Sequence, residues 1–116
     1  MTRFPAVALL VLALAGCGGS DAAAPPERPP EYTGVLEESD GEGRLLVRAE
    51  GDACGIWTAP EDDASAYGAT EDGRYEEIGW DDLRTGSTVD LWIPGPIAES
   101  CPMQGAAEAV AVTSRR

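Results

Sequence analysis

The fold is indicated most clearly by the stretch Ser87-Thr88-Val89-Asp90-Leu91-Trp92-Ile93. Its aliphatic residues Val89, Leu91 and Ile93 occupy every second position, which is the period of a β-strand with one buried face. A proline-glycine-proline triplet follows directly and ends the pattern, because proline cannot donate a ladder hydrogen bond. The same alternation places Trp92 opposite the three aliphatic side chains. This stretch therefore predicts a strand with a defined inner side.

Shorter runs of the same kind, separated by turns rich in Gly and Asp, lie along the rest of the chain. We expect the additional strands at residues 32–39, 44–50, 54–58, 74–78 and 105–113. A single helical or 3₁₀ turn is expected at residues 79–86, since Asp81 and Asp82 suit its N-terminal end and Gly86 suits its C-terminal end. Residues 59–73 carry no apolar period and are expected to form an exposed loop.

This order of elements predicts an all-β fold. Five to six short strands with regular turns favour a small OB-like β-barrel that carries one short helical turn, because closure of the sheet removes exposed strand edges. A small β-sandwich is the alternative. The barrel domain is expected to span residues 32–114.

The N-terminal segment has the pattern of a bacterial lipoprotein signal. Arg3 provides a positive charge, and the apolar run after it ends in Leu14-Ala15-Gly16-Cys17. In this pattern the cysteine receives a diacylglycerol and the chain is cut before it, so residues 1–16 are expected to be a signal peptide. The apolar run is too short to span a bilayer as a stable helix. An ordinary signal peptide cut near Gly16, with Cys17 incidental, is the alternative.

A lipidated Cys17, with acyl chains such as palmitate, would anchor the chain to a membrane on the extracytoplasmic face of the cell envelope. Residues 17–31 contain four prolines and no apolar period. This composition predicts a flexible, Pro-rich, disordered tether between the anchor and the barrel.

Composition excludes several classes of partner. The 116 residues carry a formal net charge of −13 and include neither Lys nor His. Nucleic-acid binding and docking to anionic lipids both need basic patches, so neither is expected. The lack of His removes the commonest general base near neutral pH and the commonest metal ligand. Adjacent carboxylates on a strand point to opposite faces, so no catalytic residue, metal site or cofactor is expected. Cation binding by the acidic residues of the 61–72 loop is an open alternative.

Two cysteines remain when Cys17 is lipidated. An even pair in an exported domain predicts a disulfide between Cys54 and Cys101. Two buried free thiols, or a redox or metal pair, are the alternatives. No Cys-x-x-Cys motif is present, and no His is available to activate a thiolate.

One pattern extends over the C-terminal half of the domain. It reads Leu83-x-x-Gly86-x-x-Val89-x-Leu91-Trp92, then Gly95, then Ile97-x-Glu99-Ser100-Cys101-Pro102-Met103-Gln104-Gly105. The pattern resembles the YobA-like family, a domain of unknown function in small bacterial lipoproteins and exported proteins, and Thr33-Gly34-Val35 matches the opening strand of that family. The resemblance implies an OB-like barrel outside the cytoplasm and supplies no catalytic residues. Cys101 stands where the family usually has Tyr, which fits a bridge to Cys54.

The candidate ligand-facing residues are Trp92, Glu99 and Gln104, because they combine an aromatic ring with polar side chains near the predicted disulfide. The alternative is that Trp92 caps a core and the polar residues satisfy a turn. We therefore expect an envelope lipoprotein of unknown molecular activity, with a non-catalytic binding module for a protein, glycan or small-molecule partner. A passive envelope component and a hydrolase are the alternatives.

Overall fold

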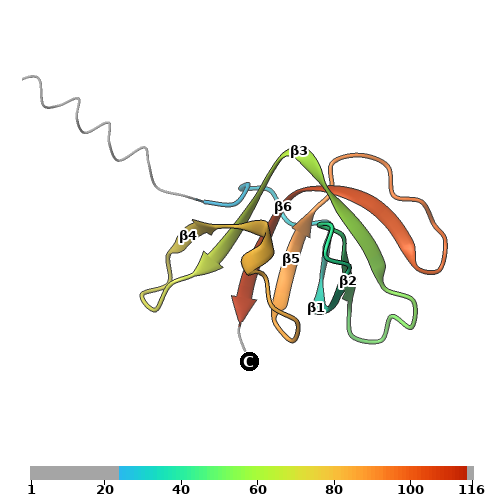
Figure 1. Ribbon diagram of the computed structural model, residues 1–116, viewed down its shortest axis with the longest axis horizontal. Coiled ribbons are helices and arrows are strands. Elements are labelled where there is room, and N and C mark those ends of the chain that lie inside the picture. The colour runs from blue at the N-terminus through green and yellow to red at the C-terminus, as the bar shows by residue number, and fades with distance from the viewer. Residues whose placement is uncertain (1–23, 115–116) are drawn as a thin grey trace, which may run out of the picture.

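The computed structural model describes residues 24–114, so the expected signal peptide and Cys17 lie outside the described residues. The chain forms six strands and one short 3₁₀ turn (Figure 1). The elements in order are β1 (Tyr32–Ser39), β2 (Leu45–Arg48), β3 (Ile56–Ala69), β4 (Tyr75–Ile78), η2 (Trp80–Asp82), β5 (Thr88–Trp92) and β6 (Met103–Ser114). This content confirms the predicted all-β class with a single helical turn.

Five of the strands close into a barrel. The sheet runs β2-β1-β5-β6-β3-β4, and an additional pairing between β2 and β3 closes the ring β1-β2-β3-β6-β5. The β3–β6 pair is parallel, whereas the other pairs are antiparallel. β4 pairs with β3 and lies outside the ring (Figure 1). This is the predicted OB-like barrel with one extra strand.

The largest difference from the sequence-based expectation is the length of β3. A strand was expected over residues 54–58, followed by a loop over 59–73, whereas β3 continues from Ile56 to Ala69. Its first half pairs with β2 and its second half with β4, while β6 runs beside both halves. The register with β6 shifts between Pro60 and Ser65, and the acidic residues 61–63 lie exposed at this irregularity. Backbone pairing sustains a strand here without an apolar period.

The core fills the barrel interior. Val89, Leu91 and Ile93 are all buried in it, which confirms the inner side expected for the central strand. The four remaining barrel strands, β1, β2, β3 and β6, all contribute side chains to this core: Leu36, Leu45, Val47, Ile56, Ala107, Val110 and Val112. Burial of each large aliphatic side chain contributes about 1.5–3 kcal/mol, so this cluster is the main source of stability.

Thr58 is a polar exception inside the barrel. Its side chain is fully buried on β3, and its hydroxyl has no hydrogen-bond partner among the described residues. An unsatisfied buried hydroxyl costs about 1–3 kcal/mol. We therefore expect Thr58→Val, which keeps the shape and removes the hydroxyl, to raise the free energy of unfolding by about 1 kcal/mol.

Urea denaturation of the purified domain measures this change. Thr88→Val is the matched control, because Thr88 is only half-buried on the outer side of β5 and its hydroxyl can reach solvent. The control is expected to leave the midpoint nearly unchanged. A lower midpoint for Thr58→Val would show that the Thr58 hydroxyl is satisfied in solution.

Candidate functional site

The predicted cysteine pair is found as a disulfide. Cys54 and Cys101 are bridged, with their Cα atoms 5.1 Å apart and 47 positions apart in the chain. The bridge joins the loop between β2 and β3 to the loop between β5 and β6. It therefore fixes two connections that meet beside the start of the parallel β3–β6 pair.

The expected ligand-facing residues do not form one surface. Trp92 is only 4% exposed, and it packs against Ala109, Ala111 and two partly buried tyrosines. This corrects the expectation that Trp92 faces a ligand: the outer side of β5 is covered, so alternation alone does not imply exposure. Glu99 is exposed on the loop before β6 and Gln104 is exposed at the start of β6, where Ala98 and Gln104 exchange two backbone hydrogen bonds.

The other two tryptophans also have structural partners. The Trp80 indole N–H donates to the carbonyl of Gly43 at 2.7 Å, which ties η2 to the turn before β2. The Arg44 guanidinium lies 5.3 Å from the centre of the Trp57 ring and also pairs with Asp40 at 2.6 Å. Both rings therefore hold loops against the barrel.

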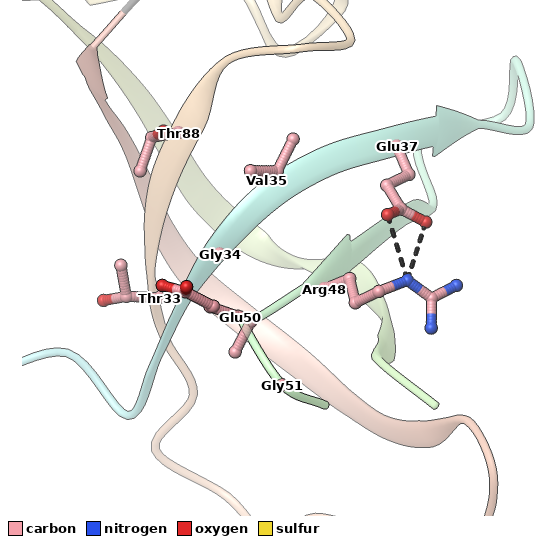
Figure 2. Close-up of a pocket in the computed structure, with 9 residues that line it drawn as sticks. Thr33, Gly34, Val35, Glu37, Arg48, Glu50, Gly51 and Thr88 are labelled. Atoms are coloured by element: carbon pink, nitrogen blue, oxygen red, sulfur yellow. Dashed lines mark hydrogen bonds and ion pairs between the residues drawn. The ribbon is translucent and has the colours of Figure 1, made fainter. Parts of the chain in front are cut away.

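A hollow that the sequence did not indicate lies over β1 (Figure 2). We call it the β1 depression; it has a volume of about 610 Å³ and is lined by Thr33, Gly34, Val35, Glu37, Arg48, Ala49, Glu50, Gly51 and Thr88. Its floor is the outer side of neighbouring strands, since Val35 pairs with Thr88 of β5 and with Arg48 of β2. Val35 is 40% exposed and is the only large apolar side chain exposed among residues 24–114.

One wall of the β1 depression is held by ionic and backbone contacts. Arg48 Nε lies 2.9 Å from both carboxylate oxygens of Glu37. Arg48 Nη1 donates to the carbonyls of Asp52 and Ala53 in the loop that leads to the disulfide. The guanidinium is therefore fixed by partners on two sides, and Figure 2 shows it meeting Glu37 at one end of the hollow. Such preorganisation reduces the entropy cost of binding a ligand.

A hydrogen-bonded network organises the turn after β2 that borders the depression. Tyr32 Oη donates to Asp52 Oδ2 at 2.5 Å, and it accepts the backbone N–H of Ala49 at 2.9 Å. Asp52 Oδ1 accepts the backbone N–H of Cys54 at 3.0 Å. The Tyr32 hydroxyl and the Cys54 and Gly55 N–H groups hold the pKa of Asp52 below its usual value. Burial and then the Asp52 carboxylate raise the pKa of Tyr32. The turn that borders the depression is thus organised by an ionised Asp52.

This network predicts a pH dependence. A carboxyl group whose pKa is lowered by folding stabilises the fold above its unfolded pKa of about 3.9, and this stabilisation is lost as the pH falls through the folded pKa. We expect Asp52→Asn to lower the thermal midpoint at neutral pH and to converge with the parent protein below about pH 4. Thermal unfolding followed by circular dichroism between neutral and acid pH measures the difference.

Asp62→Asn is the control for charge, because Asp62 is exposed on β3 and the substitution removes the same carboxylate. The thermal midpoint of Asp62→Asn is expected to change with pH nearly as that of the parent protein does. A constant difference between Asp52→Asn and the parent at all pH values would contradict the ionised-Asp52 explanation.

The acidic segment over residues 61–72 does not gather its carboxylates. Residues 61–63 lie on β3, whereas Asp72 lies in the following turn, where it accepts from Thr70 and pairs with Arg74 at 3.7 Å. Across residues 24–114, no three His, Cys, Asp or Glu side chains converge as metal ligands would. Within the same range, no helix has the length and apolar character needed to cross a bilayer.

Comparison with known proteins gives no match to a family model, a curated protein or a solved structure. The resemblance to the YobA-like family therefore stays a prediction. The β1 depression is an open hollow with an apolar centre, a fixed Glu37–Arg48 pair and two threonine side chains in its lining. A surface of this kind can hold a ligand by apolar contact and hydrogen bonding.

Proposed function

We propose that this protein is a lipid-anchored, non-catalytic binding module of the bacterial cell envelope, and that the β1 depression is its ligand site. The single observation that carries the binding proposal is the depression itself, with its exposed Val35 and its fixed Glu37–Arg48 pair. Ligand pockets commonly measure about 300–1,000 Å³ and combine an apolar lining with a few placed polar groups. The volume of about 610 Å³ falls within that range.

Charge indicates the class of ligand. Glu37 neutralises the one guanidinium of the depression, and Glu50 adds a carboxylate at its border. The chain as a whole has a formal charge of −13, which attracts cations and repels anions. The surroundings therefore favour a small ligand, or a side chain of a partner protein, with an apolar body and a positively charged amine.

Envelope anchoring is the second part of the proposal. It is supported by the sequence Leu14-Ala15-Gly16-Cys17 after an apolar run, and by the YobA-like pattern over residues 83–105. A disulfide between Cys54 and Cys101 is consistent with an oxidising compartment. The intact mass of the protein from a membrane fraction tests the anchor: a chain that begins at a diacylglyceryl-modified Cys17 supports it, and an unmodified chain contradicts it.

Binding is tested by ¹H–¹⁵N correlation spectra of the folded domain. The probes are a panel of arylalkyl primary amines and the matched uncharged alcohols. We expect amine-dependent shifts of the backbone signals of Val35, Thr88 and Gly51, with smaller shifts for the alcohols. Val35→Ser removes the apolar centre of the depression without adding a charge and is expected to weaken the amine shifts strongly.

Ala106→Ser is the matched control, because Ala106 is exposed on β6 and lies outside the depression while the hydroxyl introduced is the same. It is expected to preserve the amine shifts. Shifts centred on Glu99 and Gln104 would place the site at the start of β6 and the loop before it. The absence of any saturable shift would favour a passive envelope component.

A further inference from the structure

The end of the expected tether is attached to the barrel. Arg28 Nη1 lies 2.6 Å from Glu108 Oε2 on β6, and Arg28 Nε lies 3.3 Å from Glu31 Oε2. The indole N–H of Trp92 donates to the carbonyl of Arg28 at 2.7 Å. We call residues 28–31 the strap; its N-terminal end is thus bound to β6 by a charged pair and to β5 by an indole.

The C-terminal end of the strap is bound as well. The backbone N–H of Ile93 donates to Glu31 Oε1 at 2.6 Å. The backbone N–H of Glu31 donates to the carbonyl of Leu91 at 2.9 Å, so the pairing with β5 begins before Tyr32. The strap thus satisfies the Trp92 indole N–H, while the Trp92 ring packs against Ala109 and Ala111 of β6.

Barrel topology places the far end of the strap opposite the ligand site. In the closed ring β1-β2-β3-β6-β5, two steps separate β6 from β1 and two steps separate it from β2. β6 is therefore the strand that faces the β1–β2 side across the barrel. The β1 depression lies on that β1–β2 side, whereas Arg28 is paired to Glu108 on β6.

We infer that the strap sets the orientation of the anchored barrel: the chain leaves from the β6 side, so the β1 depression faces away from the membrane. This inference rests on the proposed anchor at Cys17. In this orientation the ligand binds on the side of the barrel away from the membrane, and membrane lipids do not occupy the depression.

Release of the strap would change this orientation. With the strap bound, the attachment point on the barrel is Arg28, and the eleven residue steps from Cys17 to Arg28 span at most about 40 Å when fully extended. With the strap released, the attachment point on the barrel is Tyr32, whose neighbour Thr33 lines the depression. The attachment point would then move from the β6 side to the border of the ligand site, and the depression would lie close to the membrane.

The first test examines the strap in the mature chain without lipid. The expected result is a Trp92 indole N–H that exchanges slowly with water and rigid backbone amides at Arg28 and Glu31 in ¹⁵N relaxation. The double variant Arg28→Ala/Glu31→Ala removes the charged pair and the acceptor for the Ile93 N–H, and we expect loss of both signatures with the barrel spectrum preserved. The control Asp72→Ala/Arg74→Ala removes another exposed acid–Arg pair and should leave both signatures intact. A mobile strap in the parent chain would overturn the inference.

The second test measures orientation on the lipidated full chain in nanodiscs that contain a gadolinium-chelating headgroup lipid. We expect paramagnetic line broadening to be several-fold stronger at Glu108 and other exposed positions of β6 than at Val35 and Gly51. The strap variant should lose this difference. Failure to associate with nanodiscs would reject the anchor and hence the proposed function. Association with equal broadening on both sides, or stronger broadening at the depression, would reject only the orientation.

Discussion

Replacement of both Cys54 and Cys101 by serine is expected to lower the free energy of unfolding by about 4 kcal/mol, because the bridge closes a loop of 47 residue positions. Cross-linking restricts the unfolded chain, and the loss grows with the logarithm of the loop length. Small domains have a total stability of about 5–15 kcal/mol, so the variant would retain only part of its folded population on heating.

The position of the bridge adds a local effect. Cys54 donates its backbone N–H to Asp52, and the carbonyls of Asp52 and Ala53 accept from Arg48 at the wall of the β1 depression. A loop that is no longer tied to Cys101 would leave these acceptors less fixed. We therefore expect weaker ligand binding together with the loss of stability.

Urea denaturation of the double variant measures the first effect, and reduced parent protein provides an independent second route to the same state. The two midpoints should agree. Ala53→Ser is the control, because it introduces the same hydroxyl at an exposed neighbour of Cys54 without breaking the bridge. An unchanged midpoint after reduction would show that the core alone supplies the stability.

The barrel could be predicted from the sequence because its strongest signal is local. Alternation of Val89, Leu91 and Ile93 gives the inner side of β5, and the turns rich in Gly and Asp give the number of strands. The length of β3 could not be predicted in this way. Its acidic residues 61–63 lie between a first half that pairs with β2 and β6 and a second half that pairs with β4 and β6. Both β4 and β6 come later in the chain.

The candidate site depends on contacts that a single strand pattern does not contain. Trp92 and Val35 both lie on outer faces, yet Trp92 is buried against Ala109, Ala111 and two tyrosines and Val35 is exposed. The one sequence feature that could have indicated the depression is Val35, an apolar residue between Thr33 and Glu37 on the polar side of β1. The hollow around it exists because the chain turns back over β1 after Arg48, which is a tertiary feature.

Gly34→Ala is expected to destabilise the domain by about 3 kcal/mol, because no space exists for a methyl group at this position. A Cβ atom on Gly34 would lie 2.5 Å from the carbonyl carbon and oxygen of Arg48 and 2.7 Å from the backbone nitrogen of Ala49. These are backbone atoms, so a side-chain rotation cannot relieve the clash. The β1–β2 pair would have to separate where Val35 and Arg48 face each other, and the depression would change shape.

Chemical denaturation and amine titration of the same variant separate the two consequences. Gly95→Ala is the matched control, since a Cβ there meets no atom within 4 Å and its backbone needs no left-handed conformation. The control should be neutral or slightly stabilising, because alanine restricts the unfolded chain more than glycine does. If Gly34→Ala retained both the parent midpoint and the amine shifts, the close crossing of β1 and β2 would not exist in solution. If it lost stability but kept the amine shifts, the ligand would lie elsewhere, because the backbone of Arg48 and Ala49 forms part of the β1 depression.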